Sequence, residues 1–294
     1  MKLIMTNFAD APITPELIKA VIPAEIVRRL IIAVDADKTT TRLDMSVSPA
    51  TKAAILAVFA AGGNVSLCTG RAYAPATHLV LPIFPESAIH VLAGGATLMT
   101  QSGERLWGRE IPGKLVAELV AQTEKLGCNF GFGLGKKFYV ASDRSQTFHK
   151  FLPGLFLDDV RDIPDLVTQQ IPILVISELN SAMKVVLEQH KSELSWKLML
   201  DFKDEEYVDI TAAGVTKVTG LAQLAKLKNL PVSEIITVGD GLNDLEMIQA
   251  GFGIAMGNAV PELKQLAKLT IGHTDNDGLA EFLLALIEAR RQLS

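Results

Sequence analysis

The stretch Ile235-Ile236-Thr237-Val238-Gly239-Asp240-Gly241-Leu242-Asn243-Asp244 carries the strongest structural signal in the chain. Its first four residues form a short apolar run, which predicts a buried strand. Two acids and an amide follow this run at once, and we expect a helix to begin near Leu245. A helix cap rich in Asp and Asn would explain one of the acids but not the whole cluster. Hard oxygen ligands at the end of a strand favour Mg²⁺.

Three further apolar runs have the same form, at residues 30–34, 65–68 and 253–256. Each run is too short for a helix and ends beside a polar or small residue, so we expect four buried parallel strands. Helical segments alternate with them, which predicts an α/β fold with a parallel sheet. Ser48 and Pro49 predict the start of a helix that stops before Gly62 and Gly63.

The run at residues 30–34 leads into Asp35-Ala36-Asp37-Lys38-Thr39. Ligands bind at the carboxyl ends of parallel strands, and two carboxylates lie here two residues apart. One of them could attack a substrate while the other moves protons. For an isolated D-x-D the alternative is a solvated turn or a cap.

Two more segments add groups that suit an anion. Thr69-Gly70-Arg71 follows the run at residues 65–68 and offers a hydroxyl and backbone N–H groups, although an ordinary strand-to-helix turn is the alternative. Lys217 opens a helix, where a cation is disfavoured, which makes an anionic partner more plausible than for a lysine elsewhere; an ordinary exposed lysine is the alternative. Four segments therefore bring chemically useful groups to strand ends or helix starts.

In order and spacing, these segments resemble the four motifs of the haloacid dehalogenase superfamily. Residues 251–259 and Asp277-Gly278 resemble its Cof-type branch, in which a large α+β cap is inserted between the second and third motifs; here 145 residues separate Arg71 from Lys217. The resemblance implies a Rossmann-type parallel-sheet core with an inserted cap. We expect an N-terminal extension at residues 1–25, a catalytic core at 26–110 and 207–294, and a substrate-specificity cap at 111–206. A helix expected from Pro15 to about Arg29 is interpreted as a packing extension.

The resemblance also implies a Mg²⁺-dependent phosphatase that hydrolyses a phosphomonoester of a small metabolite, for example a sugar phosphate. Asp35 would be the nucleophile that forms an aspartyl-phosphate, and Asp37 the acid/base. The implied phosphate-binding residues are Thr69, Gly70, Lys217 and Asn243. The implied Mg²⁺ ligands are Asp35, Asp37 through its backbone carbonyl, Asp240 and Asp244.

The chain departs from the family pattern at two positions. Lys38 stands where the family usually has glycine, and Gly94 stands where it commonly has asparagine. Because glycine in a loop often marks a left-handed backbone, Lys38 would shift the loop or add a cation beside the substrate. Two alternatives stay open: a phosphotransferase or mutase in which an alcohol accepts the phosphoryl group, and a non-catalytic binding protein that keeps the fold.

Composition restricts the function classes. The net charge is −5 with scattered Lys and Arg, which argues against a nucleic-acid partner. Cys68 and Cys128 lack a C-x-x-C spacing, which argues against a disulfide framework and favours the cytoplasm. No apolar run approaches the ~18 residues of a membrane span, and the first 20 residues lack a leader pattern. The histidines lack zinc-site spacing: His78, His90, His149, His190 and His273.

Two features of the expected cap are less informative. Paired strands are expected over residues 129–140. The glycine-rich stretch at residues 131–136 is predicted to form a β-turn rather than a phosphate loop, because Phe130 and Lys137 occupy two required motif positions. No spacing selects among the cap residues that could contact substrate, which include Tyr139, Asp143, Arg144 and Lys184.

Overall fold

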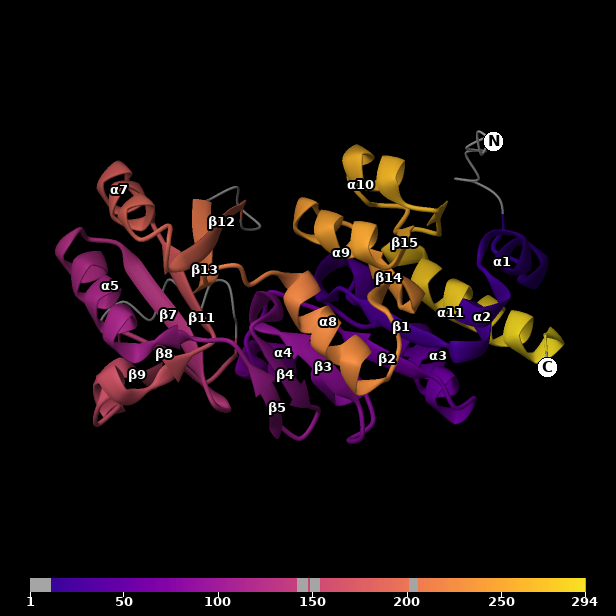
Figure 1. The fold of residues 1–294 in the computed structure, drawn as a ribbon, viewed down its shortest axis with the longest axis horizontal. Helices are drawn as coiled ribbons and strands as arrows, with labels where there is room; N and C mark the ends of the chain where they lie inside the picture. The colour runs from indigo at the N-terminus through magenta and orange to yellow at the C-terminus, as the bar shows by residue number, and fades with distance from the viewer. Residues whose placement is uncertain (1–11, 142–147, 149–153, 201–205, 294) are drawn as a thin grey trace. The chain divides into compact units, whose positions relative to one another are not determined.

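The four apolar runs form neighbouring parallel strands in the computed structural model, which describes residues 12–141, 148, 154–200 and 206–293 (Figure 1). Asp143, Arg144 and His149 lie outside the described residues. The chain divides into two compact units. Unit 1 comprises residues 1–68, 79–90 and 221–294, and unit 2 comprises residues 69–78 and 91–220. The division falls within one strand, β3 (Ile89–Leu92), and two helices, α4 (Tyr73–Leu79) and α8 (Lys217–Leu227).

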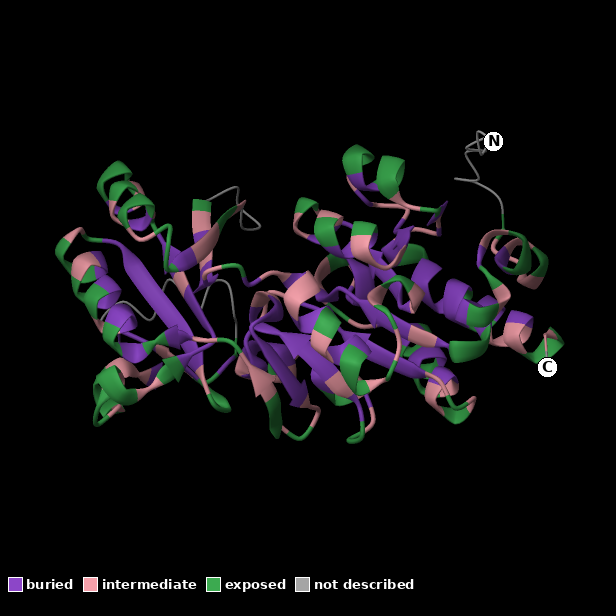
Figure 2. Cartoon of the chain, viewed as in Figure 1, coloured by how far each residue is buried: buried purple, intermediate pink, exposed green. Residues whose placement is uncertain are grey.

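Unit 1 is built on a five-stranded parallel sheet with the order β16-β15-β14-β1-β2. Its strands are β1 (Ile31–Val34), β2 (Asn64–Leu67), β14 (Ile236–Gly239), β15 (Phe252–Ala255) and β16 (Leu269–Thr270). Strands β1, β2 and β14 are almost wholly buried, as Figure 2 shows. Strands buried on both faces read as continuous apolar runs, which explains why the sequence revealed them.

Helices cover this sheet and one another. Helix α9 packs on β14 and β15, α3 packs on β2, and α11 packs on α3. The helices of unit 1 are α1 (Pro15–Val21), α2 (Ala24–Arg29), α3 (Pro49–Ala60), α9 (Leu245–Ala250), α10 (Pro261–Leu266) and α11 (Gly278–Gln292). The expected start of α3 is confirmed, because the Ser48 hydroxyl accepts a hydrogen bond of 2.9 Å from the Thr51 N–H.

The single helix expected from Pro15 to about Arg29 is wrong. The chain forms α1 and α2 instead, with Ile22 in an extended conformation before Pro23. Proline lacks an N–H and disfavours a helical conformation in the residue before it, so the helix ends there. The packing role is seen directly: α1 and α2 both pack on α11, and Lys19 donates a hydrogen bond to the side chain of Gln292.

Unit 2 contains a six-stranded sheet with the order β12-β13-β11-β7-β8-β9, which is antiparallel except between β8 and β9. Helix α5 packs on β7 and on α7. The strands of unit 2 are β4 (Thr97–Thr100), β5 (Arg105–Gly108), β6 (Ile111–Pro112), β7 (Asn129–Leu134), β8 (Lys137–Val140), β9 (Asp158–Asp159), β10 (Gln170–Ile171), β11 (Ile173–Ser177), β12 (Leu194–Leu200) and β13 (Glu206–Ala212). Its helices are α5 (Gly113–Lys125) and α7 (Ser181–Gln189); α4 (Tyr73–Leu79) begins in it.

The paired strands expected over residues 129–140 are confirmed as β7 and β8, but the β-turn expected over residues 131–136 is wrong for most of its length. Residues up to Leu134 belong to β7, and only the two residues before β8 form the turn. The glycines serve close packing: a Cβ at Gly131 would fall 2.6 Å from the Phe138 ring, and one at Gly133 would fall 2.6 Å from Ala72.

Within the described ranges, no helix is long and apolar enough to cross a membrane.

Candidate active site

Two of the expected site residues stand at equivalent places on neighbouring strands of unit 1. Asp35 directly follows β1 and Asp240 directly follows β14, and these strands pair in parallel with Val34 opposite Val238. The Asp35 N–H extends the ladder by donating to the Val238 carbonyl at 2.9 Å. The carboxyl ends of both strands therefore present an acid at the same edge of the sheet, as the sequence predicted.

The loop after β14 owes its shape to two glycines. The Asp244 carboxylate turns back to accept hydrogen bonds from the N–H groups of Asp240 (3.0 Å) and Gly241 (3.1 Å). It passes so close to Gly239 that a Cβ there would fall 2.5 Å from Oδ2 of Asp244. A Cβ at Gly241 would likewise fall 2.5 Å from the side-chain oxygen of Asn243. The glycines thus leave room for the side chains that follow them.

Asp35, Asp240 and Asp244 converge. Each offers a carboxylate oxygen, and these oxygens all lie within 4.8 Å of one another. All three residues are largely buried. Like charges held together away from water repel, and a divalent cation offsets that repulsion. Three hard oxygen donors also match the ligand preference of Mg²⁺, so the residues present fit that ion.

Asp37 lies within the tight turn that follows β1, is only partly buried and is not among the three converging carboxylates. The turn covers Ala36–Thr40 and closes with a hydrogen bond of 2.9 Å from the Thr41 N–H to the Ala36 carbonyl. The buried hydroxyls of three consecutive threonines stabilise it. Thr39 donates to the Asp240 carboxylate (3.0 Å), Thr40 donates to the Asp35 carbonyl (2.6 Å), and Thr41 accepts from the Lys38 N–H (3.2 Å).

The backbone conformation at position 38 explains why glycine is usual there in the family that the motifs resemble. Its backbone is left-handed, with φ 56° and ψ 12°, and its side chain is exposed. A residue with a Cβ pays roughly 1–2 kcal/mol for this conformation. The loop therefore keeps the left-handed geometry with a lysine in place.

In unit 2, the turn at residues 93–95 connects the two other motif segments. The Gly94 N–H donates to the Thr69 carbonyl at 3.0 Å, and the Ala93 N–H donates to the Arg71 carbonyl at 2.8 Å. On its other side the turn touches the start of α8, because a Cβ at Gly95 would fall 1.9 Å from the Thr216 carbonyl oxygen. Lys217 opens α8, as expected, and is 5% exposed.

Gly94 is also left-handed, with φ 65°, a conformation that glycine and asparagine both tolerate. The departure at this position therefore keeps the backbone geometry. Gly70 lies near β13, since a Cβ there would fall 3.2 Å from the Asp209 carboxylate.

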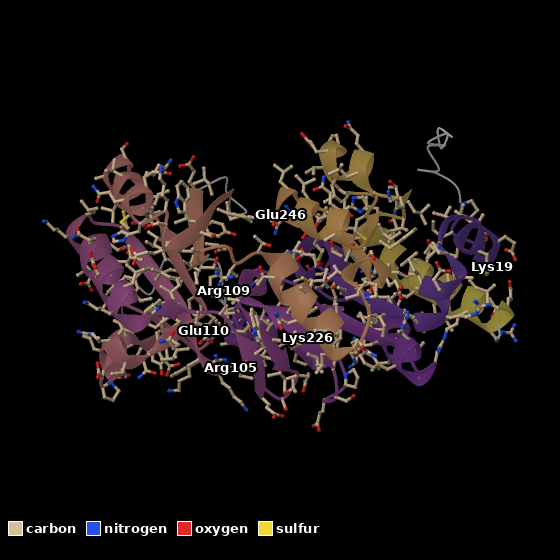
Figure 3. The ribbon with its side chains drawn as sticks, viewed as in Figure 1. Lys19, Arg105, Arg109, Glu110, Lys226 and Glu246 are labelled. Atoms are coloured by element: carbon tan, nitrogen blue, oxygen red, sulfur yellow. The ribbon has the colours of Figure 1, made fainter. Side chains whose placement is uncertain are left out.

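The candidate cap residues that the structure describes have neighbours of their own. The Tyr139 ring stacks on Phe132, and Lys184 pairs with Glu206 at 2.8 Å. Figure 3 shows the side chains of the chain and labels Arg105 and Glu110, which form an ion pair of 3.2 Å. Burial raises the pKa of Glu110, and the charge of Arg105 opposes this shift.

Comparison with known proteins agrees with this geometry. The family model of the haloacid dehalogenase-like hydrolases matches residues 32–283, which is most of the chain. This chain belongs to that family. Its motifs and fold place it among the Cof-type members of the haloacid dehalogenase superfamily.

Relatives of this hydrolase span nearly its whole length. An HMP-PP phosphatase from Serratia proteamaculans is 24% identical over 85% of this chain and 93% of the relative. A 5-amino-6-(5-phospho-D-ribitylamino)uracil phosphatase from Bacillus subtilis is 27% identical over 88% of this chain and 98% of the relative. The solved structure of a phosphatase of the same superfamily from Bacteroides thetaiotaomicron has a TM-score of 0.72 at 22% identity, covering 91% of this chain and 98% of that one.

Sequence reasoning missed several residues of the hydrolase that shape the loop carrying Asp37. Thr40 and Thr41 were not singled out, nor were Asn258 and Thr274, which contact the same loop from the other end of the chain. Three successive threonines after D-x-D were the available signal for the first two. No local signal pairs residues that lie more than 200 positions apart.

Proposed function

We propose that this hydrolase is a Mg²⁺-dependent phosphatase that acts on a phosphomonoester of a small metabolite through an aspartyl-phosphate on Asp35. The observation that carries the proposal is the convergence of the Asp35, Asp240 and Asp244 carboxylates at one edge of a parallel sheet. Such a cluster is costly without a cation, and its nucleophile candidate directly follows β1, an interior strand of the sheet.

The proposed chemistry has two half-reactions. A carboxylate oxygen of Asp35 attacks phosphorus and the bond to the leaving oxygen breaks, while Asp37 donates a proton to that oxygen. Water then attacks the aspartyl-phosphate, with Asp37 accepting its proton, and phosphate is released. These roles suit the geometry of the loop, in which Asp35 is buried and Asp37 is partly exposed.

Charge neutralisation is the main physical requirement, because an anionic nucleophile approaches an anionic substrate. Asp35, Asp240, Asp244 and the Asp37 carbonyl would hold Mg²⁺, which when bound offsets this repulsion. Thr69, Gly70, Lys217 and Asn243 are proposed to bind phosphoryl oxygens. We propose that residues 111–206 form the substrate-specificity cap.

The relatives support this substrate class. Two are named as phosphatases of phosphorylated small molecules, and one similar solved structure is that of a sugar phosphatase. The proposal therefore names small phosphorylated metabolites as substrates, sugar phosphates among them.

The test is phosphate release from a panel of sugar phosphates and one aryl phosphate, with Mg²⁺ or with EDTA. We expect turnover with Mg²⁺ and a loss on the order of 10³-fold or more in Asp35→Asn. Asp44→Asn is the matched control, since Asp44 is exposed on the same segment and bonds to Ser46. A folded parent protein that releases no phosphate from any substrate would overturn the proposal.

A further inference from the structure

The left-handed backbone at Lys38 is held by a side chain 220 positions away. Nδ2 of Asn258 donates a hydrogen bond of 2.7 Å to the Lys38 carbonyl. The side-chain oxygen of Asn258 accepts a hydrogen bond of 3.0 Å from the Thr274 N–H. One amide group thus bridges the loop carrying Asp37 and the segment that precedes α11.

An amide is the group that this bridge requires. A carbonyl oxygen needs a donor and a backbone N–H needs an acceptor, and asparagine presents one of each on a short side chain. Aspartate has the same shape but lacks the donor, so its carboxylate would face the Lys38 carbonyl oxygen. Asn258→Asp therefore removes half of the bridge and leaves its outline intact.

Thr274 adds a second connection. Its buried hydroxyl lies 2.9 Å from the Thr41 carbonyl oxygen and 3.4 Å from that of Thr39. The segment that carries it is tightly packed at its base, because a Cβ at Gly278 would fall 2.2 Å from the backbone of Gly272. The anchor for the loop is therefore a closely packed turn and not a free chain end.

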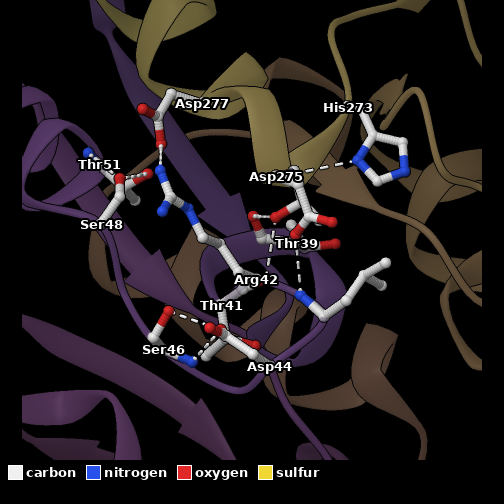
Figure 4. A network of polar contacts seen from close by, with 12 residues as sticks. Thr39, Thr41, Arg42, Asp44, Ser46, Ser48, Thr51, His273, Asp275 and Asp277 are labelled. Atoms are coloured by element: carbon white, nitrogen blue, oxygen red, sulfur yellow. Dashed lines mark hydrogen bonds and ion pairs between the residues drawn. The ribbon is translucent and has the colours of Figure 1, made fainter.

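Further contacts join the same two segments, as Figure 4 shows. The Arg42 guanidinium pairs with Asp277 at 2.9 Å, and the Leu43 N–H donates to the Asp275 carboxylate at 3.0 Å. These two contacts lie beyond Thr41, farther along the chain from Asp37. Asn258 differs from them because it binds the residue directly after Asp37.

The conformation of Lys38 bears directly on Asp37. The peptide between them carries the Asp37 carbonyl, so the left-handed φ of Lys38 sets the direction of that carbonyl and the backbone from which the Asp37 carboxylate projects. A left-handed backbone costs a lysine conformational free energy, so the lysine keeps it only where contacts with the surrounding structure stabilise it. The contact that holds its carbonyl is Asn258.

We propose that Asn258, supported by Thr274, is a positioning residue for Asp37 and acts by holding the left-handed backbone at Lys38. This inference rests on the proposed function, because it concerns the residue proposed as acid/base. Asn258 acts through the Lys38 backbone and is not proposed to contact the substrate.

The test compares two substrates that differ in how much they need a proton donor: an aryl phosphate with a good leaving group and an alkyl phosphate with a poor one. In Asn258→Asp we expect kcat for the alkyl phosphate to fall roughly 10- to 100-fold, because a displaced acid costs most where protonation matters. We expect kcat for the aryl phosphate to change less than about threefold. Asp275→Ala, which removes a contact to Leu43, should not alter the ratio of the two rates.

A second comparison uses Lys38→Gly. Glycine adopts the left-handed conformation readily, so the loss caused by Asn258→Asp should be at least about threefold smaller in the Lys38→Gly background. If Asn258→Asp does not fold, Thr274→Val tests the supporting contact, since it keeps the side-chain shape and removes the hydroxyl that reaches the Thr41 carbonyl. Equal losses on both substrates, or a loss that Lys38→Gly leaves unchanged, would overturn the inference.

The two proposals fail in different ways. A parent enzyme without phosphate release overturns the proposed function. A parent enzyme that turns over both substrates, with Asn258→Asp and Thr274→Val showing no selective loss, overturns only the positioning role of Asn258.

Discussion

The Leu67 N–H donates a hydrogen bond of 3.0 Å to Nδ1 of His90, whose ring is fully buried in unit 1. The ring must therefore carry its proton on Nε2 when neutral, and no group in the described part of the chain hydrogen-bonds to Nε2. The Phe84 ring packs edge-on against the His90 ring, with 4.7 Å between the two ring centroids. Burial lowers the pKa of His90 from 6.5 to about 3.

This pKa predicts acid sensitivity. Between pH 6.5 and about 3 the unfolded chain binds a proton at His90 and the folded chain does not, so folding stability falls as pH falls. Below pH 6.5 the free energy of unfolding should fall by roughly 1.4 kcal/mol for each pH unit because of His90. Urea unfolding at pH 7, 6 and 5 should show a shallower pH dependence in His90→Gln than in the parent. His78→Gln, at an exposed position, is the control. A pH dependence in His90→Gln equal to that of the parent would contradict the assignment of this effect to His90.

The close approach at Gly239 predicts a severe effect of Gly239→Ala. The added methyl group would displace the Asp244 carboxylate, which also holds the N–H groups of Asp240 and Gly241. Displacement of the proposed Mg²⁺ ligands should lower kcat by on the order of 10²-fold and raise the Mg²⁺ concentration needed for half-maximal activity. Gly241→Ala should be milder, since its methyl group meets the end of the Asn243 side chain, which can shift. Activity of Gly239→Ala at the parental level would show that Asp244 need not occupy this position.

The carboxylate cluster predicts opposite effects of Asp240→Asn with and without metal. In EDTA the substitution should raise the melting temperature, because it removes one of three clustered negative charges. With Mg²⁺ the parent should gain about 2.7 kcal/mol at a concentration 100 times its Kd, and Asp240→Asn should gain less. Thermal unfolding in both conditions measures this crossover. A variant that is destabilised in EDTA would indicate that the repulsion is relieved in another way.

The turn at residues 93–95 predicts a contrast between neighbouring glycines. A methyl group at Gly95 would meet the Thr216 carbonyl oxygen at 1.9 Å, and a backbone atom cannot easily move aside. Gly95→Ala should therefore lower stability and raise KM, by shifting the Thr69 segment relative to Lys217. Gly94→Asn should be tolerated, because asparagine accepts the left-handed backbone and a Cβ there meets Thr211 at only 3.5 Å. Equal tolerance of both changes would contradict this account of the turn.

Much of the fold could be predicted because its central strands are buried on both faces. The observed strands match the apolar runs to within one residue; β14, for example, covers Ile236–Gly239 where 235–238 was expected. The break between α1 and α2 was visible as Pro23 and was given too little weight. The glycines of β7 were misread, because glycine permits both turns and close packing, and its neighbours in space decide between them.

The candidate site, like the fold, could be predicted from the sequence only in part. Its acids, hydroxyl and lysine stand in short motifs that can be read locally. What holds the loop in shape could not be read, because the Lys38 conformation depends on Asn258 and the Thr41 carbonyl on Thr274. Hydrogen bonds between such distant residues leave no periodicity in the sequence. The lysine at position 38 was a visible departure, and its left-handed backbone became evident only in the folded chain.

The bridge between residues 38–41 and residues 258–274 also has a consequence for the newborn protein. A ribosome makes the segment with the proposed nucleophile early and the anchoring turn more than 200 residues later. Strand β1 likewise waits for its partner β14, so for most of translation the Asp35 segment lacks both its neighbouring acids and its support. The candidate site is therefore completed late in synthesis, and an unfinished chain carries its proposed nucleophile without the groups that would make it reactive.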